Sequence, residues 1–247
     1  MRSKVNKGKT LIGTIYTIGS PQVAEIISIS GFDWVLIDME HSTLSLDAVQ
    51  SALQAIGEDV IKIVRVPGND EIWIKRVLDT GCDGILVPMV KNSEEAEKVV
   101  RYSKYPVQGQ RSVGVTRAHG YGANFAEYIS GANRDIIIMI QVEHHEGVKN
   151  IDSIVSVKGI DSIFIGPYDL SASMGFIGQP GHPEVKAAVS TVKNRCRDAG
   201  LPYGIFGANP EVLKDEVADG CKFLLCGIDS VVLTNAFLEL VKRLKKN

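Results

Sequence analysis

The sequence lacks several features that would assign a protein to a class at once. No apolar run reaches the ~18 residues of a membrane-spanning helix, and the charged start MRSKVNKGK precedes a strand-like segment rather than a signal-peptide core. Basic residues cluster only in the ending KRLKKN and the net charge is -2, so the basic surface of a nucleic-acid binder is missing. We therefore expect no membrane partner and no nucleic-acid partner.

Motifs of several enzyme classes are absent as well. The chain contains no HExxH, no GxxxxGK[ST], and no GxGxxG after its first strand-like segment, so the usual zinc-hydrolase, phosphate-loop and dinucleotide-binding signatures are missing. Its four cysteines, Cys82, Cys196, Cys221 and Cys226, show neither CxxC spacing nor a disulfide framework, which favours a reducing cytoplasm. Apolar residues at 45% and charged residues at 23% are typical of a soluble globular protein.

What the chain does contain is a recurring unit. Four segments begin with a glycine and enter a short apolar run two residues later: GFDWVLID from Gly31, GCDGILVP from Gly81, GIDSIFIG from Gly159 and GCKFLLCG from Gly220. Glycine suits the end of a helix because it adopts a left-handed conformation cheaply. A near-continuous apolar run of this length is typical of a strand that a parallel sheet buries on both faces.

Similar apolar runs at 11–18, 60–66, 135–142 and 202–207 bring the number of expected strands to eight. Helical patterns lie between most of them, at 20–30, 46–56, 69–80, 92–103, 182–199 and 209–220. Eight strand–helix units in a chain of this length predict a single (β/α)8 barrel domain over residues 1–247. A doubly wound open sheet is the alternative, which the missing GxGxxG disfavours.

Four residues precede helical patterns and are of the types that cap helix N-termini: Ser20, Asn69, Asn92 and Asn209. The stretch 104–134 breaks the strand–helix rhythm. Loops of that length in a compact domain are usually functional, and we expect this one to contribute to function.

Polar residues gather at the C-terminal ends of the expected strands, where barrel enzymes place their chemistry. The second strand ends in Asp38, Glu40 and His41, the third in Arg65, the fifth in Gln141 and Glu143, and the sixth leads to Asp169. Packing alone does not require polar groups on four strand ends, so together they indicate a site.

A divalent metal fits the two carboxylates Glu143 and Asp169, because hard oxygen ligands suit Mg²⁺ or Mn²⁺ better than Zn²⁺. Co²⁺ is a third candidate. The adjacent His144 and His145 point opposite ways in an extended chain, so we interpret them as loop residues rather than as a shared pair of ligands.

Two further residues suggest the chemistry. His41 stands at a strand end beside acids and is placed to act as a general base, with a structural role as the alternative. Arg65 offers a planar fork that matches a carboxylate, which favours an anionic 2-oxo acid substrate. Schiff-base chemistry needs a lysine near the top of the barrel, and neither Lys62 nor Lys91 is well placed, so metal-assisted chemistry is preferred.

The segments FDWVLIDMEHS, VRVPGNDEIWIKRVLDTGCDGILVPMVKNSEEA and GIDSIFIGPYDLSASMGFIGQPGHPEV closely resemble the HpcH/HpaI aldolase family. The resemblance runs from about residue 10 to 230. It implies a (β/α)8 barrel of the phosphoenolpyruvate/pyruvate-binding type. The implied activity is that of a class II, metal-dependent aldolase, which reversibly cleaves a 4-hydroxy-2-oxo acid to pyruvate and an aldehyde.

The same resemblance implies roles for single residues. Glu143 and Asp169 match the metal carboxylates, Arg65 the arginine that holds the pyruvate end, His41 the base, and Asp79 an acid that pairs with it, contributed in the family by a neighbouring subunit. Asp38, Glu40 and Gln141 match supporting polar positions, and the backbone amides from Gly166 through Tyr168 to Asp169 match those that face the pyruvyl carboxylate. Family members typically form hexamers, as trimers of dimers, and exchange a last helix that corresponds to 231–244.

The sequence departs from the family pattern in two places, so the resemblance does not identify the aldehyde substrate. His144, His145 and Glu146 stand where many members have a threonine followed by small residues, and the stretch 104–134 keeps Arg111 and Arg117 but is not diagnostic of one substrate. Two other functions stay as alternatives: an acyl-CoA carbon–carbon lyase of the wider superfamily, and a non-catalytic protein that binds a 2-oxo acid.

Overall fold

Eight parallel strands form a closed barrel in which each strand pairs with the next and β8 pairs with β1. The structure is a computed structural model and describes residues 8–208 and 210–245. The strands are β1 (Leu11–Tyr16), β2 (Trp34–Asp38), β3 (Ile61–Arg65), β4 (Gly84–Val87), β5 (Ile137–Val142), β6 (Ser162–Ile165), β7 (Tyr203–Gly207) and β8 (Phe223–Ile228). The predicted barrel and its eight strands are confirmed.

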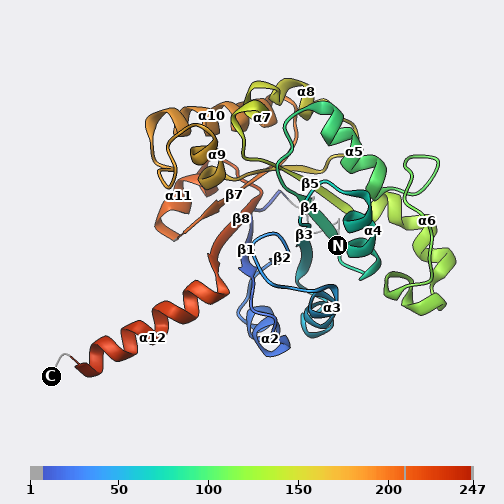
Figure 1. Cartoon of the computed structure of the whole chain (residues 1–247), viewed down its shortest axis with the longest axis horizontal. Helices are drawn as coiled ribbons and strands as arrows, with labels where there is room; N and C mark the ends of the chain where they lie inside the picture. Colours follow the sequence, from blue (N-terminus) through green and yellow to red (C-terminus); the bar gives the residue numbers. More distant parts are fainter. Residues whose placement is uncertain (1–7, 209, 246–247) are drawn as a thin grey trace.

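Helices surround the barrel (Figure 1). They are α2 (Pro21–Ile29), α3 (Leu46–Ala55), α4 (Glu71–Asp79), α5 (Ser93–Ser103), η1 (Arg117–Gly122), α6 (Phe125–Asp135), α7 (His145–Lys149), α8 (Ile151–Val155), α9 (Pro167–Ser173), α10 (Pro183–Asp198), α11 (Pro210–Ala218) and α12 (Asp229–Lys245). The six predicted helical segments are all present. The four glycines that open the recurring unit all have positive φ, between 80° and 101°, as their predicted place after a helix requires.

The structure corrects the interpretation of 104–134 as one long loop. This stretch contains the 3-10 helix η1 and most of the helix α6, and Asp135 ends that helix instead of beginning β5. The helical period was hard to recognise because α6 is polar, carrying Glu127, Ser130 and Arg134 on exposed positions and burying only Gly131 and Ala132.

Of the four predicted N-caps, the structure confirms one capping side chain. The Asn92 side chain accepts from the Glu95 amide and caps α5 as expected. Asn69 is wrong as a cap, because the neighbouring Asp70 accepts from the first amides of α4, while the Asn69 amide donates to a carbonyl of α5. Ser20 lies at the N-cap of α2 but makes no capping bond with its side chain, and Asn209 lies outside the described residues.

The core has two layers, as a closed barrel requires. Apolar side chains between the strands and the helices form the larger cluster, and a second cluster fills the barrel interior. Trp34 is fully buried in the interior, where its ring meets Phe164 and Phe223 edge to face and its indole N–H donates to the Leu11 and Leu224 carbonyls. The interior is therefore packed with side chains, and a cavity can open only at its ends.

The last helix differs from the others because little of it is buried. Figure 1 shows α12 projecting away from the barrel, and Asp229 at its start is its one buried residue. Large apolar side chains are exposed along it: Val231, Val232, Leu233, Phe237, Leu238, Leu240, Val241 and Leu244. Within the described ranges, no helix is long and apolar enough to cross a membrane.

Gly84 tests how closely the backbones of β4 and β5 pack against each other. A Cβ added to Gly84 would overlap the Ile137 carbonyl oxygen and lie 2.7 Å from the Ile137 Cβ. Gly84→Ala should therefore lower the free energy of unfolding by about 2–3 kcal/mol, measured by urea denaturation. Gly68→Ala, where nothing lies within 4 Å of the added carbon, is the control and should change it by less than about 0.5 kcal/mol. Equal effects of the two substitutions would contradict this packing.

Candidate active site

A cavity of about 310 Å³ opens at the C-terminal ends of the strands. Its polar lining comes from β2 and the turn after it, β3, β5 and the start of α9, and includes Asp38, His41, Arg65, Gln141 and Asp169. The structure thus brings together residues that the sequence placed on four separate strand ends. Glu143 lies immediately behind this lining, and its position is described below.

Arg65 is the charge around which the rim is arranged. Its side chain is buried and donates two hydrogen bonds to the Asp38 carboxylate, from Nε at 2.8 Å and from Nη2 at 2.6 Å. Its third nitrogen, Nη1, lies 3.3 Å from Glu40 Oε2. Burial opposes ionisation of both partners, but the direct pair prevails: it holds the pKa of Asp38 below its ordinary value and raises the pKa of Arg65.

His41 is the exposed member of the group. Its side chain is 60% exposed, and its Nε2 lies 3.7 Å from Glu40 Oε2. The backbone amides of Glu40 and His41 both donate to Asp38 Oδ1, so the turn after β2 is fixed by the same carboxylate that holds Arg65. This leaves the imidazole at the mouth of the cavity, open to a ligand.

Glu143 is buried, with 2% of its surface exposed. Its Oε1 accepts from the Met89 amide at 2.8 Å and its Oε2 from the side-chain amide of Gln141. Burial raises the pKa of Glu143 to about 8; the nearby Glu40 and Asp169 carboxylates add to the rise, against the Met89 hydrogen bond and Arg65. Without a further positive charge, this carboxylate is held in an environment that disfavours its ionised form.

Gly166, at the turn from β6 to α9, brings the two candidate metal ligands together. A Cβ there would lie 2.7 Å from Glu143 Oε2 and 2.9 Å from Gln141 Nε2, so only glycine allows the turn to approach so closely. Asp169 follows three residues later in the first turn of α9 and is exposed. The resulting site has one buried and one exposed carboxylate.

The residues present fit a divalent cation. Burial and then the Glu40 and Asp169 carboxylates raise the pKa of Glu143, and burial and Asp169 also contribute to the raised pKa of Glu40. The side-chain oxygen of Gln141 is buried without a hydrogen-bond partner. Over residues 8–208 and 210–245 no group of three or more His, Cys, Asp and Glu side chains could hold a metal. Two carboxylates that leave the remaining coordination positions to substrate and solvent oxygens suit Mg²⁺ or Mn²⁺.

The prediction that His144 and His145 point opposite ways in a loop is wrong, because their ring centroids lie 4.3 Å apart and His145 begins α7. Each histidine has structural partners. His144 caps α7, since its Nδ1 accepts from the Glu146 amide. Burial, and then the nearby Lys91, lower the pKa of His144. The His145 amide donates to the Ser173 hydroxyl, and its ring nitrogen lies 3.1 Å from the Ser173 carbonyl oxygen. These bonds tie the turn after Glu143 to α9.

The sequence model of the HpcH/HpaI aldolase/citrate lyase family matches residues 15–236 of the chain. The chain belongs to the HpcH/HpaI family.

Individual relatives agree with this assignment over nearly the whole chain. The hydroxypyruvate/pyruvate aldolase of Pseudomonas aeruginosa is 39% identical, over 99% of this chain and 92% of that protein. The 4-hydroxy-2-oxo-heptane-1,7-dioate aldolase of Shigella flexneri is 38% identical, over 98% and 91%. The crystal structure of an HpcH/HpaI family protein from Burkholderia cenocepacia superposes with a TM-score of 0.95 at 29% identity, covering 99% and 98%. The protein is an aldolase of this family, a carbon–carbon lyase.

Asp79 is the one predicted site residue that this HpcH/HpaI chain does not bring to the rim. It ends α4, at the opposite end of the barrel, where its Oδ1 accepts from Arg111 Nη2 at 2.7 Å. Arg111 is buried over the rings of Tyr105 and Tyr128. The sequence did not assign a role to Arg111 or Arg117. In the structure both arginines hold the stretch 104–134 against the end of α4, far from the candidate metal ligands.

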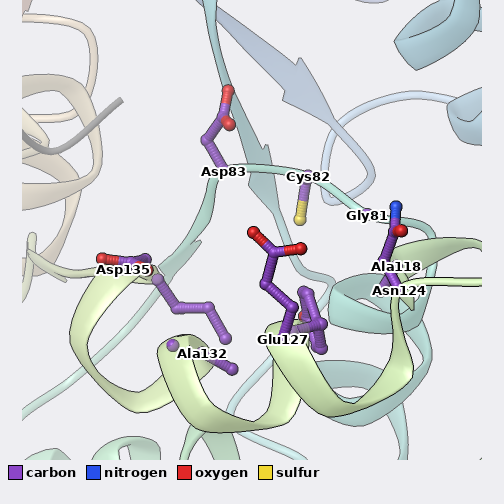
Figure 2. A pocket seen from close by; sticks show the side chains of 11 residues that line it. Gly81, Cys82, Asp83, Ala118, Asn124, Glu127, Ala132 and Asp135 are labelled. Carbon is purple, nitrogen blue, oxygen red and sulfur yellow. The ribbon is translucent and has the colours of Figure 1, made fainter. Parts of the chain in front are cut away.

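A second, larger cavity of about 450 Å³ lies at that opposite end, between the entry to β4 and α6. Figure 2 shows Glu127 pointing from α6 toward Cys82, with Asp83 and Asp135 on other sides. None of its described lining residues is a lysine or an arginine. Arg65, the buried cation of the rim, therefore has no counterpart among the residues that line this second cavity.

Sequence reasoning missed four residues around the rim. Met89 donates its amide to Glu143 from a left-handed conformation, with φ of 57°, which is unusual outside glycine and typical of functional sites. Thr17 and Ser230 line another side of the cavity, and Asp229 accepts a hydrogen bond from the Thr17 hydroxyl. Asp229 directly follows the apolar run of β8, so reading every strand end, including the first and last, could have found it.

The Asp38–Arg65 pair gives a test that does not depend on activity. Asp38→Asn leaves a buried guanidinium without its counter-charge, which should cost about 3 kcal/mol or more of unfolding free energy at pH 7. Because the pKa of Asp38 is lowered in the folded protein, its contribution is full above the unfolded value near 4 and is lost as pH falls through the folded value. The difference between wild type and variant, from urea denaturation, should therefore shrink below pH 4.

The control for this measurement is Asp198→Asn. Asp198 lies in an exposed ion pair, 3.7 Å from Arg195, and such pairs contribute little to stability. The account would be refuted if Asp38→Asn lowered the free energy of unfolding no more than the control does, or if the difference from wild type grew as the pH fell.

Proposed function

We propose that the protein is a divalent-metal-dependent pyruvate aldolase. It reversibly cleaves a 4-hydroxy-2-oxo acid to pyruvate and an aldehyde. The observation that carries this proposal is the charge arrangement at the rim. One arginine, already paired with Asp38, lies near the buried carboxylate of Glu143, whose pKa is raised by burial and by its acidic neighbours. Such a site suits an anionic substrate together with a cation. The names of the relatives, which are pyruvate and 4-hydroxy-2-oxo acid aldolases, support the same chemistry.

The 2-oxo acid end of the substrate binds between Arg65 and the start of α9. The Arg65 fork is fixed by Asp38, so it contacts the substrate without rearranging. The Gly166 amide donates to the Val142 carbonyl, which leaves the Tyr168 and Asp169 amides, as first-turn helix groups without an intrahelical acceptor, to face the pyruvyl carboxylate. Gln141 supports Glu143 from below.

Glu143 and Asp169 would hold the metal ion, which would supply Lewis-acid stabilisation of charge on the keto oxygen, a contribution of several kcal/mol. His41 removes the proton from the C4 hydroxyl. The C3–C4 bond then breaks and the aldehyde leaves. The electron pair of the broken bond stays with the other fragment, which is the enolate of pyruvate. Return of the proton to C3 gives pyruvate, and the reverse sequence gives carbon–carbon bond formation. Glu40, 3.7 Å from His41, orients the imidazole.

A covalent Schiff-base route needs an amine at this rim, and none of the described residues that line the cavity is a lysine. Lys62 lies on β3 with its ammonium donating to the Val60 carbonyl, near the entry to that strand. Lys91 follows the turn after β4 and lies 4.0 Å from Glu146. Neither lysine lines the cavity. We therefore infer that the metal ion and Arg65 bind the substrate without a covalent intermediate.

We further propose that the protein works as a homo-oligomer, a hexamer built as a trimer of dimers. The exposed apolar side chains of α12 would be covered by exchange of this helix between paired subunits. Asp79 cannot reach His41 within one chain, since the two lie at opposite ends of the barrel. Their pairing would therefore occur between subunits.

The metal requirement is tested by pyruvate release from 4-hydroxy-2-oxo acids. Excess EDTA should abolish the release, and added Mg²⁺, Mn²⁺ or Co²⁺ should restore it. Glu143→Gln should reduce the restored rate at least ~100-fold, because it removes a charged metal ligand, whereas Glu146→Gln, three residues along and exposed, serves as the matched control and should stay near the wild-type rate. Turnover that persists in EDTA and is trapped by borohydride would overturn the proposal.

A further inference from the structure

The second histidine of VEHHEG links two helices at the candidate metal site, although the proposed reaction does not use it. His145 is the first residue of α7 and follows Glu143 by two positions. Ser173 is the last residue of α9, the helix whose first turn carries Asp169. The two residues are 28 positions apart in the chain and are joined by two hydrogen bonds.

Both hydrogen bonds connect helix ends that have no partner within their own helix. The His145 amide donates to the Ser173 hydroxyl at 3.0 Å, and His145 Nδ1 lies 3.1 Å from the Ser173 carbonyl oxygen. A carbonyl oxygen only accepts, so the second bond places a proton on Nδ1. The first amide of a helix and its last carbonyl lack intrahelical partners, and α7 and α9 supply them to each other through this contact.

The contact holds one end of a short helix whose other end is also held. Helix α9 has seven residues, too few to be stable through its own hydrogen bonds. At its start the Gly166 amide donates to the Val142 carbonyl at 3.3 Å, and at its end Ser173 bonds to His145. Val142 and His145 lie on either side of Glu143 in the sequence, so both ends of α9 are fastened to the segment that carries Glu143.

The two candidate metal ligands differ in how they are held. Glu143 is buried, and its two oxygens accept from the Met89 amide and from the Gln141 side chain. Asp169 is exposed, so its position follows that of the helix backbone that carries it. The separation of the two carboxylates therefore depends on how α9 is held against the chain beside Glu143.

We propose that His145 is a positioning residue of the metal site. Its two bonds to Ser173 hold α9 so that Asp169 stays within reach of an ion on Glu143. This inference rests on the metal site of the proposed function and adds a residue to it. His145 itself touches neither the ion nor the substrate. Its position is one of those at which the sequence departs from the family pattern, and the resemblance assigns it no role.

The expected size of the effect follows from the ring bond. Residues that hold metal ligands in place contribute to metal affinity. Without the Nδ1 bond, α9 would spend part of its time where Asp169 cannot reach the ion, and the apparent affinity falls in proportion to the competent fraction. Loss of one hydrogen bond between uncharged groups shifts such an equilibrium by about 3- to 10-fold.

The test is a titration of the full chain with Mn²⁺, without substrate, in which electron paramagnetic resonance measures the free ion. His145→Ala should raise the Kd for Mn²⁺ by about 3- to 10-fold. His145→Asn should restore the wild-type Kd, because its side-chain nitrogen takes the place of Nδ1 and donates to the same carbonyl. A role that depended only on the bulk of the ring would not be rescued by this smaller side chain.

His144→Ala is the matched control. His144 bonds within its own turn, where its Nδ1 accepts from the Glu146 amide, so this variant removes the cap of α7 and keeps the bonds between His145 and Ser173. Its Kd for Mn²⁺ should stay near the wild-type value. An equal rise in both alanine variants would overturn the proposal, because the effect would then come from α7 as a whole.

Turnover gives a second readout that separates positioning from chemistry. At saturating Mn²⁺ the ion itself holds Asp169 in place, so kcat for pyruvate release in His145→Ala should return close to the wild-type value, and only the Mn²⁺ concentration for half-maximal rate should rise. A low kcat that saturating Mn²⁺ does not restore would overturn the positioning role.

Failure of the metal site itself is recognised from Glu143→Gln in the same titration. If the wild type binds Mn²⁺, Glu143→Gln weakens the binding and His145→Ala binds like the wild type, this inference alone is wrong. If the wild type binds no Mn²⁺, or if Glu143→Gln binds it equally well, the proposed metal site is wrong and the inference falls with it.

Discussion

The site depends on how one buried guanidinium is shared among several carboxylates. Arg65 gives two of its nitrogens to Asp38 and a third to Glu40, so its charge is largely compensated before Glu143 and Asp169 are counted. Glu143 consequently lies in a buried, acidic environment that raises its pKa to about 8. We therefore propose that a cation between Glu143 and Asp169 relieves this imbalance.

Much of this arrangement could be predicted because its causes are local. A strand buried on both faces leaves a continuous apolar run, and a helix that ends at a left-handed residue leaves a glycine. Both patterns recur along the chain, and the barrel rule then places the residues after each run at one rim. Asp38, Arg65, Gln141 and Asp169 reach that rim for this reason.

The parts that could not be predicted depend on contacts between distant segments. Two adjacent residues are of the type that could cap α4; Asp70 does so, whereas the Asn69 side chain donates to the Glu95 carbonyl of α5. Asp79 stands near the other residues in the family motif but ends a helix that runs opposite to the strands, so one chain places it on Arg111 instead of His41. Met89 is left-handed and its amide donates to Glu143, a contact between two different strand ends that no local pattern encodes.

The central claim is that Glu143 and Asp169 share a divalent ion while the adjacent histidines serve the backbone. Anomalous diffraction from crystals grown with Mn²⁺ and pyruvate tests this directly. The account predicts one manganese peak in contact with both carboxylates and with the oxygens of pyruvate. A peak on His144 or His145, with Glu143 free of metal, would contradict it.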